Sequence, residues 1–475
     1  MSKIKSLDEL VAIRENARSR GKKVVFVNGY FQTLHPGHIS FLSRAKDCGD
    51  VLIVGINSDK SLRCNKGFRT SAEDEGSRAT MISAIEAVDR VCIFDDLTPF
   101  KLISKLQPDV LVKGDNYDLD DVLGKDVVQS YGGKVILLPF DRRYNSDDIV
   151  RATHGSGFEL RCRTRERDIS EYFKQIDSFL DLAEIIGSKR RIISSEMKRF
   201  IRIRYNGGYI HPFTTGFSTQ IYREGCNLID NGDPYAHAKI TSNSEAQRLA
   251  INFNPHSLAE RLRLAILGNL MDYGACLDGS HLNLEDVKHK FESLNILEID
   301  HTDELEKKIE EVSANKGRIF YLVDNSGEII FDKFMLEYLR EKVGQNNLFI
   351  VGKEKPMQTD LTANELKELG YEQYGQIVST GSDCFGLHEE EVSEEFIELF
   401  KTADLVIAKG QAYMEFFREY DWANVFNVLM VKFPMDVGPY KLPAMKGVVI
   451  DSRRYASRDG SGLIYPIEKL RLVSK

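Results

Sequence analysis

Continuous apolar runs alternate with amphipathic stretches along the first third of the chain. The amphipathic stretches at 38–49, 77–88 and 99–107 carry apolar residues at helical spacing, which predicts helices. The apolar runs between them show no alternation, which predicts strands that are buried on both faces. They cover 23–31, 50–59, 89–96, 108–114 and 132–140. The pattern predicts an α/β fold with a Rossmann-like parallel sheet that helices cover on both faces.

The pattern changes near residue 155. A charged stretch at 163–205 and a long apolar stretch at 257–274 predict a helix-rich segment. Strand and helix then alternate again up to about residue 451. We therefore expect a first domain at 1–155 and a second domain at 156–475. The second domain would have a helical lead-in at about 156–300 and a three-layer α/β core at about 301–475.

Composition narrows the class of protein. The 475 residues are too many for one ordinary core, and the formal net charge of −8 argues against a general nucleic-acid binder. No apolar run approaches the roughly 20 residues that span a bilayer, and the N-terminus lacks the apolar core of a signal peptide. The seven cysteines form no CxxC pair, which predicts free thiols. We expect a cytoplasmic protein that binds no membrane.

Two histidines, His35 and His38, follow the first predicted strand in the sequence HPGH. At the N-terminus of a helix their rings can donate hydrogen bonds to phosphate oxygens, and the helix dipole adds to the attraction. Gly37 lets the backbone approach a phosphate, and Pro36 restrains the turn. The alternative is that one or both histidines only cap the helix.

Three later strands also end in polar residues. One ends in Asp324 and Asn325, a second leads to Asp383, and a third ends in Lys409 and Gly410. Oxygen ligands at a strand end suit Mg²⁺, Mn²⁺ or another divalent ion. A lysine and the N–H groups of a turn can hold phosphoryl oxygens beside it.

Each of these residues also has a purely structural explanation. Asp324 and Asn325 could be an ordinary helix N-cap. Glu328 and Asp332 could only support the first turn of that helix. Asn269 lies in a mainly apolar helix and could be a buried amide whose hydrogen bonds are satisfied.

The segments NGYFQTLHPGH, GDVLIVGINSD, EAVDRVCIF, PDVLVKGDNY and GGKVILLPF resemble the cytidylyltransferase-like family. The nearest branch is the adenylyltransferase domain of bifunctional ADP-heptose synthase. The resemblance implies that a sugar phosphate attacks the α-phosphorus of ATP or CTP, usually with Mg²⁺. It further implies that His35 and His38 stabilise the transferring phosphate and that other residues bind the nucleotide or its phosphates. These are Gly29, Phe31, Lys46, Arg78, Lys113, Gly114 and Ser146.

This chain departs from the family pattern in two places. Gln32 stands where the family usually has Asp. The Ser/Thr-rich phosphate motif becomes YNSDDI, in which Ser146 is the only Ser or Thr and Asp147 and Asp148 add negative charge.

The motifs YLVDNSGEIIFD, STGSD and AKGQ, with GNLMDYG upstream, resemble the metal-dependent damage-control phosphatase family. The resemblance implies that Asp324, Asn325 and Asp383 bind the metal. Lys409 and Asn269 would contact the phosphate, with Gly410 beside them. The paired cysteines of the family's prokaryotic branch are reduced to Cys162.

Together the two resemblances imply one enzyme with two reactions on small molecules. The second domain would remove a phosphate from a heptose bisphosphate, and the first would activate the remaining sugar 1-phosphate with a nucleotide. Two alternatives remain: a house-cleaning phosphatase of stray sugar phosphates, or a phosphatase that a nucleotide-binding first domain regulates. Transferases of this type often pair, so a homodimer is a further expectation.

Overall fold

The computed structural model describes residues 2–66, 73–115, 117–140, 143, 169–207, 214–271, 284–388, 391–417, 424–432, 434–437 and 440–454. The chain divides into two compact units. The first comprises Met1–Pro212 and Gln220–Asn231, and the second comprises Phe213–Thr219 and Gly232–Lys475. The expected boundary near residue 155 lies outside the described residues and stays a prediction.

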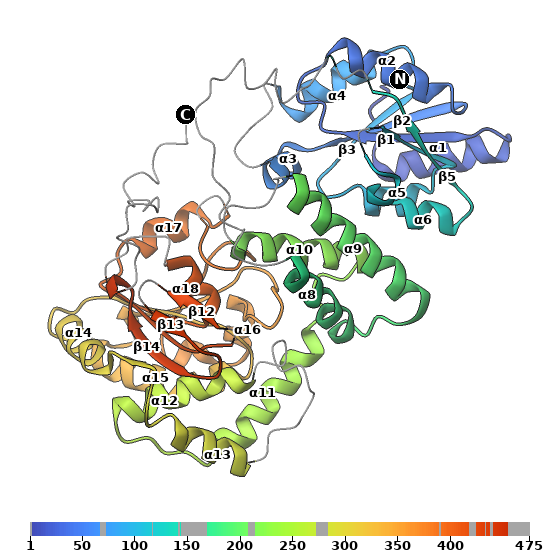
Figure 1. Cartoon of the computed structure of the whole chain (residues 1–475). Helices are drawn as coiled ribbons and strands as arrows, with labels where there is room; N and C mark the ends of the chain where they lie inside the picture. The colour runs from blue at the N-terminus through green and yellow to red at the C-terminus, as the bar shows by residue number, and fades with distance from the viewer. Residues whose placement is uncertain are drawn as a thin grey trace. The chain divides into compact units, whose positions relative to one another are not determined.

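The first unit is built on a five-stranded parallel sheet in the order β3-β2-β1-β4-β5 (Figure 1). Its strands are β1 (Val24–Gly29), β2 (Val51–Asn57), β3 (Arg90–Phe94), β4 (Val110–Gly114) and β5 (Lys134–Leu138). The chain runs outward from β1 to β3 and then returns to the other side of β1. The strand order therefore reverses between β1 and β4, and the carboxyl ends of these strands form the usual ligand crevice of such sheets.

Helices cover both faces of this sheet. One face packs on α2 (Pro36–Lys46) and α4 (Glu75–Ser83). The other packs on α1 (Leu7–Ser19), α5 (Phe100–Leu106) and α6 (Lys125–Ser130). Successive residues of β1 alternate between the two cores, Val25 and Val27 in one and Val24 and Phe26 in the other, because side chains along a strand point to opposite faces.

Shorter elements and three longer helices complete the first unit. They are α3 (Asp59–Lys66), η1 (Leu119–Asp121), α8 (Ile169–Leu182), α9 (Gly187–Gly207) and the part of α10 (Thr214–Ile229) from Gln220 onward.

The second unit holds a seven-stranded sheet in the order β6-β14-β11-β10-β7-β8-β9. All neighbouring strands are parallel except β11 and β14. The strands are β6 (Ile299–Asp300), β7 (Ile319–Leu322), β8 (Leu348–Gly352), β9 (Gln376–Ser379), β10 (Leu405–Lys409), β11 (Val425–Met430) and β14 (Gly447–Asp451), with β12 (Met435–Val437) and β13 (Tyr440–Leu442) as a separate hairpin. The order reverses between β7 and β10, so a second ligand crevice is expected at their carboxyl ends.

This sheet is the middle of three layers. One core joins it to α11 (Ala236–Ala250), α12 (Leu258–Leu267), α13 (Leu284–Ser293), α14 (Thr302–Ala314), α15 (Glu328–Val343) and α16 (Ala363–Glu368). The opposite face packs on α17 (Glu394–Phe400) and α18 (Gln411–Phe417). The remaining short helices are η3 (Gly268–Met271), η4 (Gln345–Asn347), η5 (Tyr371–Gln373) and η6 (Ser452–Arg454).

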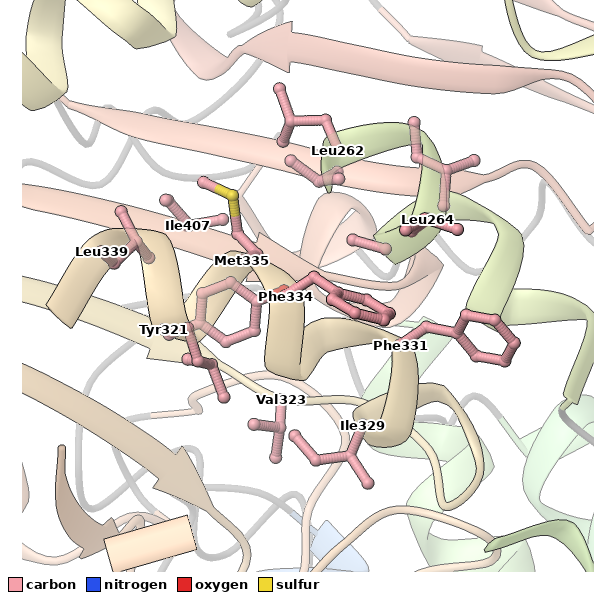
Figure 2. Packing of buried hydrophobic residues seen from close by; sticks show 14 of the residues in the cluster. Leu262, Leu264, Tyr321, Val323, Ile329, Phe331, Phe334, Met335, Leu339 and Ile407 are labelled. Carbon is pink, nitrogen blue, oxygen red and sulfur yellow. The ribbon is translucent and has the colours of Figure 1, made fainter. Parts of the chain in front are cut away.

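Figure 2 shows the larger core from close by. Phe331, Met335 and Leu339 of α15 lie among Tyr321 and Ile407, which come from the neighbouring strands β7 and β10. This packing fixes the start of α15 relative to both strand ends. The three-layer architecture confirms the fold predicted from the sequence.

The described helices include none with the length and apolarity that a bilayer crossing requires. The five cysteines in the described part of the chain form no disulfide with one another.

Candidate functional site

The two histidines lie at the start of α2, at the mouth of the first crevice. The His35 Nδ1 atom accepts a hydrogen bond from the backbone N–H of His38 over 3.3 Å, so His35 caps the helix. The two imidazoles stack with their centroids 3.8 Å apart. The edges of Phe31 and Phe140 pack around His38, with centroids 5.0 Å and 5.8 Å away.

His38 is uncharged at neutral pH. Burial, and secondarily the neighbouring His35, lower the pKa of His38 to about 3. The His38 Nδ1 atom is buried and, among the described residues, has no hydrogen-bond partner. A buried polar atom that lacks a partner is costly, so the mouth of this crevice suits a ligand with hydrogen-bonding oxygens.

Lys113 and Asn28 meet at the reversal of the strand order. The Lys113 Nζ atom donates to Asn28 Oδ1 over 2.6 Å and lies 5.7 Å from the centre of the Tyr117 ring. Burial lowers the pKa of Lys113 to about 8. Gly114 follows as the last residue of β4. Sequence reasoning missed Asn28, although a polar residue at the end of an apolar strand was the available signal.

Gly29 and Phe31 shape the turn after β1. Phe31 has a φ of 48°, and a Cβ on Gly29 would lie 3.0 Å from the Phe31 ring. Phe31 itself is buried in the core of this face, and Gln32 beside it is buried as well. The glycine therefore makes room for the ring that packs against His38.

The structure does not bring Lys46 or the side chain of Arg78 to the histidines. Lys46 ends α2, and its Nζ atom pairs with Asp89 Oδ2 at 2.5 Å. That carboxylate also accepts from Leu52 N at the start of β2, so Lys46 lies toward the amino edge of the sheet.

Arg78 is fully buried, and its guanidinium donates to Tyr30 O and Asp59 Oδ1 over 2.6 Å and 2.7 Å. It holds the turn after β1 in place, because a buried guanidinium requires such partners. Ser146, Asp147, Asp148 and Cys162 lie outside the described residues.

Asp324 and Asn325 are buried directly after β7, in the second crevice. The Asn325 Nδ2 atom donates to Asp324 Oδ2 over 2.8 Å, and its Oδ1 atom accepts from the Thr359 hydroxyl over 2.7 Å. Gly410, directly after β10, has a φ of 81°, and a Cβ there would lie 1.9 Å from Asp324 Oδ2. Only a glycine leaves room for this carboxylate.

Asp360 joins this pair, and sequence reasoning missed it. Asn325 and Asp360 form an isolated antiparallel bridge, and Leu361 N donates to Asp324 O over 3.1 Å. The Asp360 carboxylate is buried and lies 3.8 Å from Lys353 Nζ. Asp360 comes eight residues after β8, which is why a search of strand ends did not find it.

Asp383 lies in the loop after β9, and β8 separates β9 from β7. The carbonyl of the next residue, Cys384, accepts a hydrogen bond from Lys353 Nζ. The structure thus puts Asp360 rather than Asp383 beside Asn325, and a ligand role for Asp383 stays a prediction.

Lys409 and Asn269 belong to a buried polar network under the crevice. The Lys409 Nζ atom contacts the Glu328 carboxylate and lies 3.2 Å from Asp332 Oδ1. The Asn269 Nδ2 atom donates to Glu328 Oε2 over 2.6 Å, and its Oδ1 atom accepts from Met430 N over 2.7 Å.

Lys409 and Asn269 both contact Glu328, and a phosphate contact for either of them stays a prediction. All three charged groups of the network have no exposed surface, and buried charges need such partners. Burial foremost raises the pKa of Asp332 to about 7, which reduces the excess of negative charge around one lysine.

The donor atoms of the second crevice are oxygens. Among the described residues, no group of three or more His, Cys, Asp or Glu side chains could hold a metal ion. The candidate set is instead two carboxylates and one amide, Asp324, Asp360 and Asn325. An all-oxygen set fits Mg²⁺ or Mn²⁺, and the cradle that Gly410 leaves for Asp324 agrees with a functional carboxylate.

Comparisons with known proteins match both halves of the chain. The profile of the cytidylyltransferase-like family matches residues 26–154, and that of the damage-control phosphatase ARMT1-like domain matches residues 166–441. These matches confirm both resemblances and the pairing of a nucleotidyltransferase domain with a phosphatase domain.

Two curated relatives resemble the first part. The bifunctional protein HldE of Geobacter metallireducens is 50% identical over 155 residues, which are 32% of this chain and 32% of the relative. The HldE of Geotalea uraniireducens is 47% identical over 156 residues, 33% of this chain and 32% of the relative. The chain thus spans about a third of the length of these relatives.

A solved structure resembles the second part. A DUF89 family protein from Pyrococcus horikoshii is 27% identical and has a TM-score of 0.51. The likeness covers 60% of this chain and 97% of that protein. The profile match alone covers more than half of the chain, and it shows that the chain belongs to the damage-control phosphatase family with ARMT1-like domains, preceded here by a cytidylyltransferase-like domain.

Proposed function

We propose that this protein carries out two reactions on phosphorylated sugars. The second unit removes a phosphate with the help of a divalent ion. The first unit then transfers a nucleotidyl group, from ATP in the first instance, to the remaining sugar 1-phosphate. We place this enzyme in the cytoplasm, as a homodimer that acts on small molecules and not on nucleic acid.

The observation that carries the phosphatase proposal is the gathering of Asp324, Asn325 and Asp360 at the carboxyl end of β7. These three side chains would hold the ion. When bound, a divalent ion supplies Lewis-acid chemistry that neutralises phosphoryl charge. The network of Lys409, Glu328 and Asn269 supports the start of α15 from beneath, and so keeps Asn325 in register with Asp360.

For the nucleotidyl transfer, the imidazoles of the histidine pair would donate hydrogen bonds to the phosphate oxygens. An oxygen of the sugar phosphate would attack the α-phosphorus, and pyrophosphate would leave. The protein mainly positions the reactants and offsets charge in such a transfer. Lys113, at the reversal of the strand order, is the charged group placed to neutralise a phosphate.

The test is to give the full chain a heptose bisphosphate and ATP with Mg²⁺ or Mn²⁺ and to follow the products by ³¹P NMR. We expect inorganic phosphate first, and then pyrophosphate with a nucleotide sugar. Formation of neither product ends the proposal.

The same experiment decides between the alternatives. Turnover of many sugar phosphates at similar rates favours a house-cleaning phosphatase. A phosphatase rate that changes with nucleotide, without any pyrophosphate, favours a regulatory first domain.

A further inference from the structure

Helices α9 and α10 pack against the nucleotidyltransferase fold, although the phosphatase profile begins before them at residue 166. Helix α9 and the part of α10 from Gln220 onward belong to the same compact unit as the first sheet. The HldE relatives match about 155 residues of this chain. The sequence profile therefore assigns these helices to the phosphatase domain, whereas the structure groups them with the nucleotidyltransferase domain.

One end of the contact holds the segment that follows β4. Gly124 N donates to Glu196 Oε2 over 2.9 Å. The Arg199 guanidinium donates to the carbonyl of Asp120, pairs with Glu196 at 2.5 Å, and lies 3.4 Å from Asp126 Oδ2. Glu196 and Arg199 are both buried, so the contact excludes water.

The other end holds the segments that follow β2 and β3. The Gln220 Nε2 atom donates to Cys64 O over 2.8 Å, and Arg204 donates to Asn65 O over 3.3 Å, both near the end of α3. The Thr98 hydroxyl, between β3 and α5, donates to the buried Glu224 carboxylate. Side chains of α9 and α10 thus replace water as partners of these loops.

All three segments follow carboxyl ends of strands, and β2 and β4 are the two neighbours of β1 in the sheet. The histidine turn follows β1. In a doubly wound sheet the loops at this edge form the ligand crevice. The two helices therefore hold, by hydrogen bonds, the loops after β2 and β4, which lie on either side of β1, the strand that leads to the histidine pair.

We propose that α9 and the second part of α10 form a fixed wall of the nucleotidyltransferase crevice, with Gln220 and Glu224 as residues that position the loops after β2 and β3. The part of this inference that concerns nucleotide rests on the proposed function. The part that concerns the loops rests on the contacts alone.

The charge of α9 agrees with this placement. Its sequence GSKRRIISSEMKRFIRIRYNG contains Lys and Arg at seven positions and a single acidic residue, Glu196, in a chain of net charge −8. Arg190, Arg199 and Arg202 already pair with aspartates of the first unit, so this charge serves to hold the neighbouring segments in place.

The test compares four variants of the full chain. Gln220→Ala removes the donor to Cys64, and Glu224→Ala removes the acceptor of Thr98. Arg190→Ala is the matched control, because Arg190 is also on α9 but pairs with Asp181 of α8 at 2.7 Å. Glu224→Gln retains an acceptor for Thr98 and should rescue the effect of Glu224→Ala.

Two measurements are made on each variant. Hydrogen exchange of residues 59–66 should rise about five-fold in Gln220→Ala, as the loss of one neutral hydrogen bond predicts, and it should stay unchanged in Arg190→Ala. Calorimetric affinity for a non-hydrolysable ATP analogue should fall in Gln220→Ala and Glu224→Ala, while Mn²⁺ affinity stays unchanged.

Exchange in residues 59–66 of Gln220→Ala that matches the Arg190→Ala control would overturn the inference. If wild-type protein binds no nucleotide, the proposed function fails, and the exchange measurement still decides the role of the helices. An equal loss of Mn²⁺ affinity would show general unfolding and would also count against a local wall.

Discussion

Gly410 lies against the carboxylate of Asp324, so any side chain at this position must displace it. A Cβ would come within 1.9 Å of Asp324 Oδ2. We expect Gly410→Ala to lower Mn²⁺ affinity and phosphatase rate by at least about ten-fold, which corresponds to roughly 1.4 kcal/mol.

Gly344→Ala is the control for this change. Gly344 has a φ of 80° but no heavy atom within 4 Å of a built Cβ. Its φ of 80° and ψ of 158° are a backbone conformation that alanine also avoids, at a cost of roughly 1–3 kcal/mol, but no carboxylate lies against it. Calorimetric titration of both variants with Mn²⁺ separates the two effects, and equal affinities would contradict the explanation.

Asp360 and Asp383 offer a second test at the scale of single residues. Asp360 is bridged to Asn325, whereas Asp383 follows a strand two places away from β7. We expect Asp360→Asn to abolish measurable Mn²⁺ binding and Asp383→Asn to change it by less than about three-fold, since only the former removes a ligand charge next to Asn325. The reverse order of effects would restore Asp383 as the ligand.

At the scale of elements, the sequence predicts strands and their ends better than it predicts side-chain partners. Apolar runs locate β1 and β7 because burial on both faces leaves a continuous pattern. His35, His38, Asp324 and Asn325 could be found because they follow such runs directly. The order of strands in each sheet, and hence the distance of β9 from β7, is set by crossover connections that leave no local signal.

Partners of buried charges were harder to predict. The sequence indicates that Lys409 ends a strand, but it does not indicate that the ammonium group of Lys409 forms ion pairs with Glu328 and Asp332. Asp360 was missed because it lies in a loop after β8, and α9 shows no local sign of its contact with Gly124. These pairings depend on tertiary structure, which single-sequence periodicity does not encode.

Glu224 makes the packing of α10 depend on pH. Burial foremost raises its pKa to about 8 from an ordinary 4.5, with Thr98, Asp96, Arg204 and Glu196 as its charged or hydrogen-bonding neighbours. The folded chain then holds a proton that the unfolded chain has released. This contribution to stability is complete below the unfolded pKa and is lost as pH rises toward the folded pKa.

We therefore expect the free energy of unfolding of the first unit to fall as pH rises between about pH 4.5 and about pH 8. Glu224→Gln should flatten this dependence, because an amide does not titrate in this range. The measurement is urea unfolding at several pH values, followed by pulse-labelling hydrogen exchange of α10. An unchanged slope in Glu224→Gln would show that another group, such as Glu196 with its pKa raised to about 7, controls the effect.

At the scale of the whole molecule, the two crevices use different chemistry and should be separable. The first relies on His38, whose Nδ1 atom is buried without a partner among the described residues, and the second relies on oxygen ligands around Asp324. We expect His38→Ala to lower the rate of pyrophosphate formation by at least about 100-fold, as loss of a transition-state hydrogen-bond donor commonly does. The rate of phosphate release should stay within about two-fold of the wild-type rate.

Asp324→Asn should do the opposite when the sugar 1-phosphate is supplied directly. It should abolish phosphate release from the bisphosphate and leave nucleotidyl transfer to the monophosphate intact. With the bisphosphate as the only sugar, however, both variants should fail to make the nucleotide sugar. Asp324→Asn does not form the sugar 1-phosphate that the second reaction needs, and His38→Ala forms it but does not transfer the nucleotidyl group to it. Mixing the two variants should restore it if the intermediate diffuses freely between molecules. Recovery well below the wild-type rate at equal enzyme concentration would indicate that linking the units in one chain raises the local concentration of the intermediate.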